Sequence, residues 1–246
     1  MNVNYANAYI DSILKDKRGV IPSFIIKYGP PGSGKSTITS DLIRKLKIPK
    51  NTLVDVNVDD IIHSNKKFEE DIAKASSASE RQSIYQRYRK PADIISDTLL
   101  NTCLINKYNI SWETTGNTIS WTVREIDRIR KIGYNIILIY PYTTNTNIFE
   151  RIKKRSQVSA NNAQIKRIAV SAQKNINRLI DYVDELYVYD NNSTKPYLLF
   201  SIRNRYNWNK EDKARLVEVK CNKQKYCSQR TSLPRELVKL MKQCEC

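Results

Sequence analysis

The sequence predicts an α/β fold with a mainly parallel sheet of five strands. Short apolar runs alternate with amphipathic stretches as far as residue 190, and a glycine-rich loop joins the first apolar run to the next amphipathic stretch. Such alternation implies parallel pairing with right-handed crossovers. The 246 residues suffice for one such domain with a large core and a small appendage.

Each expected strand is a short apolar or alternating run bounded by polar or turn residues. Pro141 is expected to end the fourth strand. A sixth, less regular strand is expected after the Asn191-Asn192-Ser193 turn. In order, the expected strands are residues 23–28, 53–58, 109–114, 134–140, 185–190 and 197–203.

The expected helices show apolar residues at helical spacing. Gly19 and Pro22 follow the first, which should pack against the edge of the domain, and Gly133 occupies the C′ position of the fourth. Pro91 is expected either to kink the long third helix or to divide it. The helical stretches are residues 4–15, 36–47, 68–107, 120–132, 144–155 and 163–180, with a short one at 233–241.

The loop between the first strand and the second helix has the spacing G-x-x-x-x-G-K-[ST] of a phosphate-binding loop. Glycine lets backbone N–H groups turn tightly around a pyrophosphate, and the following helix directs its positive end at the same phosphates. We therefore expect ATP with Mg²⁺, the ion being bound by the Ser36 hydroxyl. The expected nucleotide contacts are Gly29, Gly32, Ser33, Gly34, Lys35, Ser36 and Thr37.

Polar residues that follow two other strands favour a kinase over other proteins that have a phosphate-binding loop, such as ATPases and GTPases. Asp59 and Asp60 follow the second strand, at the sheet edge where ligands of α/β proteins bind. A carboxylate there can accept the proton of an attacking hydroxyl, the role expected of Asp59. Asp60, Glu113 and Thr114 are expected to contact the acceptor, and Glu113 could instead hold Mg²⁺ through water. The alternative for the aspartates is a helix N-cap.

Residues 141–180 contain eight basic residues and one acidic residue. Arginines on a mobile helix pair are suited to neutralise the charge that develops on a transferring phosphoryl group. We expect a lid around residues 151–167 in which Arg151, Arg155 and Arg167 take this catalytic role together with Lys35. The alternative is a solvated basic face.

The net charge of +17 suggests a polyanionic partner, although abundant Lys, Asn, Ile and Tyr are also typical of AT-rich coding sequences. Four of the five cysteines lie after residue 220, at spacings that fit no common zinc site, so free thiols are expected. The start of the chain lacks the features of a signal peptide, and no apolar run could cross a bilayer. A cytoplasmic protein without membrane contact is expected.

Four features point to a known group: the loop Gly29–Ser36, the run Asn57-Val58-Asp59-Asp60, the later Lys66-Lys67-Phe68 and the three arginines. Through them the chain resembles the zeta-toxin and polynucleotide-kinase branch of P-loop kinases over about residues 20–192. The resemblance implies a three-layer sandwich with strand order 2-3-1-4-5, and a lid between the fourth and fifth strands. The change of pattern after the Asn191-Asn192-Ser193 turn separately predicts a kinase domain over residues 1–195 and a basic appendage over 196–246. Two departures stand out: Ile61-Ile62-His63 replaces an arginine frequent in polynucleotide kinases, and Thr-Thr-Gly follows Glu113.

The expected function is transfer of the γ-phosphoryl group of ATP to a hydroxyl acceptor. The resemblance to zeta toxins favours a nucleotide sugar, whereas the aspartate motif and the positive charge favour a polynucleotide 5′-hydroxyl. A different class also fits the sequence: a nucleic-acid-binding ATPase or switch module whose basic tail, residues 203–242, follows a phosphate backbone.

Overall fold

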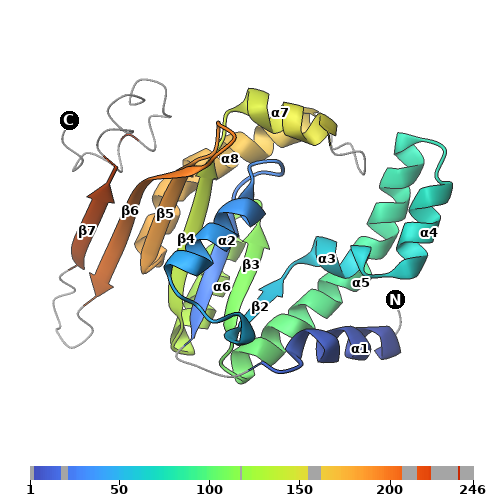
Figure 1. Ribbon diagram of the computed structural model, residues 1–246, viewed down its shortest axis with the longest axis horizontal. Coiled ribbons are helices and arrows are strands. Elements are labelled where there is room, and N and C mark those ends of the chain that lie inside the picture. The colour runs from blue at the N-terminus through green and yellow to red at the C-terminus, as the bar shows by residue number, and fades with distance from the viewer. Residues whose placement is uncertain are drawn as a thin grey trace.

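The computed structural model describes residues 3–17, 22–116, 118–154, 162–206, 215–222 and 238. Its centre is a single sheet with strand order β2-β3-β1-β4-β5-β6-β7 (Figure 1). The five parallel strands are β1 (Ser23–Tyr28), β2 (Leu53–Val56), β3 (Asn109–Thr114), β4 (Asn135–Tyr142) and β5 (Glu185–Asp190). The expected order 2-3-1-4-5 is therefore confirmed.

Helices cover both faces of the sheet because alternate strand residues point to opposite faces. Phe24 and Ile26 of β1 enter the larger core cluster, to which α5 (Ala78–Ile105), α6 (Ile119–Lys131) and α8 (Asn162–Leu179) contribute. Ile25 enters a second cluster with Ile38 and Leu42 of α2 (Lys35–Lys45). The result is a three-layer sandwich.

The sheet continues beyond residue 195. The strands β6 (Tyr197–Tyr206) and β7 (Arg215–Cys221) extend it in antiparallel fashion. Leu199, Phe200 and Ile202 of β6 are buried in the larger core cluster. The expected boundary between a kinase domain ending at 195 and an appendage is thus corrected, since the hydrophobic core runs across it.

The segment after β2 differs from the expected strand. The strand ends at Val56, and Asn57 caps α3 (Val58–His63), its Oδ1 accepting the backbone N–H of Asp59 at 3.0 Å. Neither Asp59 nor Asp60 is the cap, and both lie in the first helical turn. A short polar side chain in extended conformation before a helix satisfies an otherwise unpaired N–H group.

The long helical region divides at Ser77 rather than at Pro91. Ser77 caps α5 by accepting from the Glu80 N–H, which separates α5 from α4 (Lys66–Lys74). Glu80 in turn accepts from the N–H of Ser76 at 2.9 Å. The helix α5 passes through Pro91, which removes one backbone hydrogen bond but leaves 28 residues helical. In Figure 1, α4 and the first half of α5 extend beyond the β2 edge of the sheet.

Pro141 does not end β4, contrary to expectation. It pairs in register with Tyr189 of β5, whereas β1 pairs with β4 only as far as Ile139. The missing N–H group of Pro141 therefore lies beyond the end of the β1 ladder.

The helix α1 (Val3–Leu14) packs against the edge of the domain, as expected. The Tyr5 hydroxyl donates to the Ile61 carbonyl at 3.0 Å, and α1 contacts α5. The remaining helix is α7 (Asn145–Lys154), which packs on α8 through Ile148, Ile165 and Ala169.

Cys103 is a buried free thiol, but Cys221 is disulfide-bonded, so the expectation of free thiols is wrong at Cys221. Most of the basic tail, including 223–237, lies outside the described residues. No helix within the described ranges combines the length and the apolar character needed to cross a membrane.

Candidate active site

The phosphate-binding loop adopts the backbone that its sequence predicts. Gly29, Gly32 and Gly34 all have positive φ, and Gly34, at φ 87°, is the N-cap of α2. A Cβ atom at Gly34 would collide with the amide of Asn191, which donates to the Ser33 carbonyl at 2.6 Å. Glycine is therefore required there both by conformation and by the close approach of the chain that follows β5.

Lys35 is buried below the loop, with 5% of its surface exposed. Its Nζ donates to the carbonyls of Gly29 and Pro30 at 2.9 and 3.0 Å and lies 3.1 Å from Glu113 Oε1. These contacts come from the loop that follows β1 and from β3, which pairs with β1, so the sheet topology determines where the ammonium group lies.

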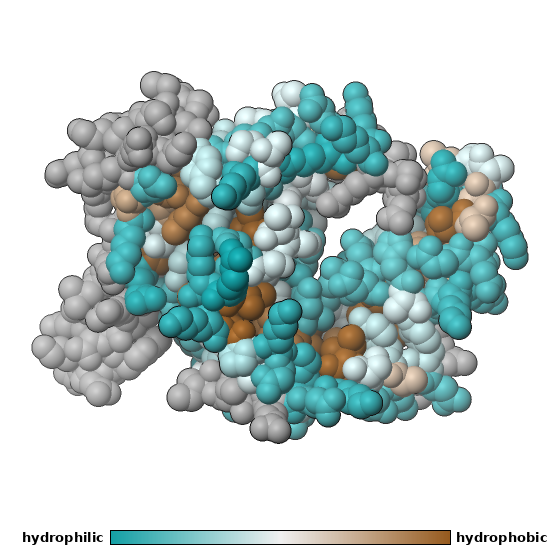
Figure 2. All heavy atoms as spheres, in the orientation of Figure 1, coloured by the Kyte–Doolittle hydropathy of each residue, from teal (hydrophilic) through white to brown (hydrophobic). Residues whose placement is uncertain are grey.

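Two cavities flank the loop, and both are lined by Gly32 and Gly34. The first, of about 480 Å³, lies between the loop, the start of α3, α5 and the ends of β2 and β3; we call it the acceptor-side cavity. The second, of about 570 Å³, lies between the loop, α7 and the β5–β6 connection; we call it the nucleoside-side cavity. Figure 2 shows the molecule hollowed, with a largely hydrophilic rim, between the α3–α5 region and the body of the sheet.

Asp59 lines the acceptor-side cavity, and its side chain is 55% exposed. Its Oδ1 accepts from the Tyr85 hydroxyl at 2.7 Å and lies 3.8 Å from Arg89 Nη1. Burial, with a contribution from the Asp59 carboxylate, raises the pKa of Tyr85 to about 12, so this hydroxyl remains a donor. The carboxylate is thus held in place while its surface stays open to the cavity.

A second charged group supports Glu113 from inside the sheet. Lys27 of β1 is 1% exposed; its Nζ donates to Asp55 Oδ1 at 2.6 Å and lies 3.9 Å from Glu113 Oε2. Glu113 therefore lies between two buried lysines, Lys27 and Lys35. Such pairing compensates the cost of placing charges in a region of low dielectric constant.

The other expected site residues have different placements. Ser36 and Thr114 line the acceptor-side cavity, and Thr37 lines the nucleoside-side cavity. Asp60 lines neither of them; burial, together with Asp55 and other carboxylates, raises the pKa of its carboxyl above the ordinary value. The expected role of Asp60 in binding the acceptor is therefore not matched by its position.

Only one of the three expected lid arginines meets the loop among the described residues. Arg151 of α7 donates to the Asn191 carbonyl at 2.6 Å and to the Gly32 carbonyl at 3.5 Å. Arg167 is exposed on α8 and lines neither cavity, so its expected role at the phosphoryl group stays a prediction. Arg155 lies outside the described residues.

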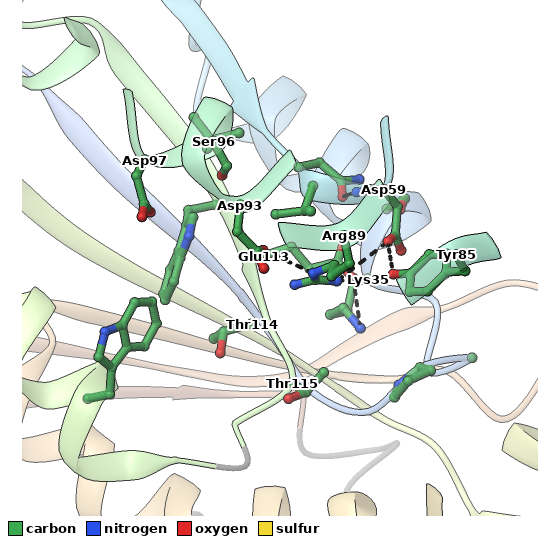
Figure 3. A pocket seen from close by; sticks show the side chains of 18 of the residues that line it. Lys35, Asp59, Tyr85, Arg89, Asp93, Ser96, Asp97, Glu113, Thr114 and Thr115 are labelled. Atoms are coloured by element: carbon green, nitrogen blue, oxygen red, sulfur yellow. Dashed lines mark hydrogen bonds and ion pairs between the residues drawn. The ribbon is translucent and has the colours of Figure 1, made fainter. Parts of the chain in front are cut away.

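Sequence reasoning missed a row of α5 residues that lines the acceptor-side cavity. Four of them are spaced by four positions, which places them along one helix face. They are Tyr85, Arg89, Asp93 and Asp97; in Figure 3 Tyr85 and Arg89 lie near Asp59 and Lys35, Asp93 lies near Glu113, and Asp97 lies farther along the wall. Trp112 and Trp121 complete the wall. The spacing was visible in the sequence, but only the crossover that brings α5 beside the loop connects it to the site.

The residues fit a nucleoside triphosphate with Mg²⁺. The loop has the required positive φ angles, Ser33 Oγ is buried without a hydrogen-bond partner in the described part of the chain, and Ser36 is exposed at the cavity. An unpaired hydroxyl beside a glycine-rich turn is suited to accept a bond from, or donate one to, a bound group. The Ser36 hydroxyl is a suitable Mg²⁺ ligand.

No curated protein matches the chain. Among solved structures, the PezAT chromosomal toxin-antitoxin system of Streptococcus pneumoniae is similar with a TM-score of 0.59 and 15% identity, over 80% of this chain and 81% of that chain. The AvrRxo1-ORF1:-ORF2 complex with ATP is similar with a TM-score of 0.56 and 13% identity, over 81% of this chain and 64% of that chain.

These similarities confirm the expected P-loop kinase fold, and with it the resemblance stated from the sequence. The model of the family described as AAA domain (AAA_33) matches residues 24–178, from the first strand to the last turn of α8. The matched range contains the phosphate-binding loop, Asp59, Glu113 and the row on α5. The chain belongs to this AAA-domain family of P-loop proteins.

Proposed function

We propose that the protein is an ATP-dependent phosphotransferase that acts on a hydroxyl group. The observation that carries the proposal is the acceptor-side cavity, which is lined by Lys35 and Ser36 of the loop, Asp59 of α3 and Glu113 of β3. A nucleotide-binding loop beside an accessible carboxylate is what transfer to a hydroxyl requires.

The two cavities suggest where the substrates bind. The nucleoside-side cavity, lined by Thr37, Arg151 and Asn191, would take the base and ribose of ATP. The triphosphate would then lie along the loop, with its γ-phosphoryl group directed toward the acceptor-side cavity. Arg151, already in contact with the Gly32 carbonyl, is near enough to the loop to neutralise phosphate charge.

In the proposed reaction a bond forms between the acceptor oxygen and the γ-phosphorus, while the bond from that phosphorus to the β,γ-bridging oxygen breaks. ADP leaves with the electron pair, and Asp59 takes the proton of the acceptor hydroxyl. Lys35 stabilises the charge on the phosphate oxygens, and Glu113 orients the lysine and the acceptor. Mg²⁺ bound at Ser36 would neutralise charge on the β- and γ-oxygens.

A nucleotide sugar and a polynucleotide 5′-hydroxyl are both candidate acceptors for this reaction. Incubation of the protein with labelled ATP and each acceptor in turn separates them, since only the true acceptor becomes labelled. Transfer to neither would direct the search to other hydroxyl-bearing metabolites.

The proposed function is tested by replacing Asp59. Asp59→Asn keeps the shape of the side chain and its contact with Tyr85 but cannot accept a proton, so transfer should fall by roughly 10²- to 10⁴-fold while ATP affinity stays within about twofold. Lys35→Ala should instead abolish ATP binding, because it removes the cation below the loop.

For both variants, ATP binding is measured by calorimetry, and product formation is measured with a cell extract as the source of the acceptor. Circular dichroism serves as the control for folding. Normal transfer by Asp59→Asn would remove Asp59 from the mechanism, and ATP binding by Lys35→Ala at wild-type affinity would remove the loop from nucleotide recognition.

A further inference from the structure

We propose that the acceptor enters the acceptor-side cavity as a phosphate-free, sugar-like ring, whose hydroxyl groups are bound by Asp93 and Asp97 and whose face stacks on Trp121. This inference rests on the proposed phosphotransferase function and narrows its acceptor: it disfavours both a nucleotide sugar and a polynucleotide end, because each carries phosphate, and favours another hydroxyl-bearing metabolite. It concerns the end of the cavity that lies along α5, beyond Asp59 (Figure 3).

The row on α5 leads from the proposed base to this subsite. The Tyr85 hydroxyl donates to Asp59 at 2.7 Å and accepts from Arg89 Nη1 at 3.0 Å. Arg89 Nε donates to Asp93 Oδ1 at 2.9 Å, and Asp97 follows one helical turn later. Asp93 is thus linked to Asp59 through Arg89, whereas Asp97 lies about 6 Å farther along the helix, so a ring bound at both would direct one hydroxyl group past Arg89 toward Asp59.

The charges on the cavity wall oppose a phosphate-bearing acceptor. The described lining residues include four carboxylates, Asp59, Asp93, Asp97 and Glu113, against two cations, Lys35 and Arg89. Lys35 is held by Glu113, and Arg89 is held by Asp93 with Asp59 nearby, so both charges are already compensated. The phosphates of ATP add further negative charge. A second anion would be repelled, whereas hydroxyl or amino groups would be attracted.

The two tryptophans supply an apolar face for a ring. Trp121 is 42% exposed although it is large and apolar, and it lines the cavity. Its ring centroid lies 5.2 Å from that of Trp112, which is 8% exposed and packs against Phe24 at 5.8 Å. Trp121 thus contacts Trp112 on one side and leaves the rest of its ring exposed to the cavity. Exposed aromatic faces of this kind bind the flat apolar side of a ring while polar groups fix its orientation.

The Asp97 carboxylate has no hydrogen-bond donor from the described residues. Within the described parts of the chain its carboxylate makes no hydrogen bond and no ion pair, and its residue lines the cavity. Burial, with Asp93 and Glu125 nearby, raises the pKa of this carboxyl above its ordinary value. Asp97 is exposed, so water hydrates its carboxylate in the free protein, and ligand hydroxyl groups would take the place of that water.

The first experiment measures binding without chemistry. Asp59→Asn saturated with a non-hydrolysable ATP analogue is titrated by calorimetry with matched pairs: adenosine and adenosine 3′-monophosphate, a free hexose and its uridine diphosphate conjugate, and glucosamine. A 5′-hydroxyl oligonucleotide is included. We expect the phosphate-free or amino member of a pair to bind and its phosphorylated counterpart to bind at least about threefold more weakly. Equal or tighter binding of the phosphorylated members would overturn the proposal.

The second experiment uses variants of the wild-type enzyme. Asp97→Asn and Trp121→Ala should each raise the KM of the preferred acceptor by roughly tenfold with the KM of ATP unchanged. Asp127→Asn on the exposed side of α6 is the matched control and should leave both values unchanged. Unchanged acceptor KM in both cavity variants, or transfer to the oligonucleotide alone, would refute the subsite while leaving the phosphotransferase function intact. Ring binding without transfer to any acceptor would instead refute the phosphotransferase function and retain the subsite.

Discussion

The residue that most constrains the site is Lys27, an ammonium group inside the central strand. It is 1% exposed and links Asp55 of β2 to Glu113 of β3 from β1. Three neighbouring strands thus share one buried charge. The lysine fixes Glu113 from the side opposite Lys35, so the two lysines together set the position of a carboxylate in the proposed site.

Replacement of Lys27 should destabilise the protein. Lys27→Met leaves Asp55 and Glu113 without their shared cation, and we expect a loss of about 1–3 kcal/mol in the free energy of unfolding, because Asp55 is 50% exposed and can rehydrate. Urea denaturation measures the change. The double variant Lys27→Met, Asp55→Asn should recover part of it, and a single variant as stable as wild type would contradict this account.

Asp60 gives the stability a defined pH dependence. Burial, then Asp55, raises the pKa of its carboxyl above the ordinary value of 3.8, so the folded state holds the proton to higher pH than the unfolded state does. The ionised carboxylate therefore destabilises the fold at neutral pH, and this penalty disappears as pH falls through the raised folded pKa toward 3.8.

Asp60→Asn removes that penalty. Its melting temperature at pH 7 should exceed that of wild type, by an amount that corresponds to less than about 1 kcal/mol because the group is partly solvated. The difference between the two proteins should shrink steadily in melts below pH 5. A difference that stays constant from pH 7 to pH 4 would show that Asp60 does not titrate as described.

At the scale of elements, the short helix α3 positions the proposed base. Asn57 caps it by accepting the N–H group of Asp59 itself, so the cap and the functional residue share one hydrogen bond. The buried Ile61 and Ile62 then anchor the helix in the core. This is the reason that a six-residue helix can hold a partly exposed carboxylate at a fixed place.

Asn57→Ala should reduce both stability and turnover. Loss of the cap is expected to lower the free energy of unfolding by about 1 kcal/mol and to reduce kcat, with ATP affinity retained. Asn65→Ala is the matched control, since Asn65 caps α4 by the same contact, to the Lys67 N–H at 3.0 Å, away from the cavity. Equal kcat values for the two variants would mean that the Asn57 cap has no part in positioning Asp59.

At the scale of the whole molecule, the antiparallel strand β6 is part of the domain. It pairs with β5 over Glu185–Asp190 and places Leu199, Phe200 and Ile202 in the main core. The turn between β5 and β6 also carries Asn191, which bonds to the phosphate-binding loop. The segment after residue 195 therefore contributes to the core, and the turn that leads into it contacts the phosphate-binding loop.

Phe200→Ala should accordingly behave as a core substitution. Phe200 is fully buried, and its truncation is expected to lower the free energy of unfolding by about 3–5 kcal/mol. Ser201→Ala, on the opposite face of the same strand, should change it by no more than about 0.5 kcal/mol. Denaturant titrations of both variants provide the measurement, and a mild effect of Phe200→Ala would show that β6 is dispensable.

The sequence alone determined the alternation of strands and helices, the order of the parallel strands through a family resemblance, and the phosphate-binding loop. These features depend on local chemistry: glycine at positive φ, period-2 and period-3.6 apolar patterns, and a lysine at fixed spacing. The position of Asp59 at the sheet edge was also predictable, because a polar residue after a buried strand emerges at the edge of a parallel sheet; its role as the base stays a proposal.

Only the tertiary structure decided which distant residues meet. In the sequence Lys27 is an ordinary strand residue, and only the pairing of the strands brings Asp55 of β2 and Glu113 of β3 to it. The row on α5 likewise resembles a solvated helix face in the sequence. The crossover from β2 to β3 places it beside the loop. Arg167 shows the opposite case, a residue of suitable chemistry that the helix α8 directs to solvent. The physical reason is the same throughout: a residue's type and spacing are local properties, whereas its burial and its charged neighbours depend on contacts between segments far apart in the chain.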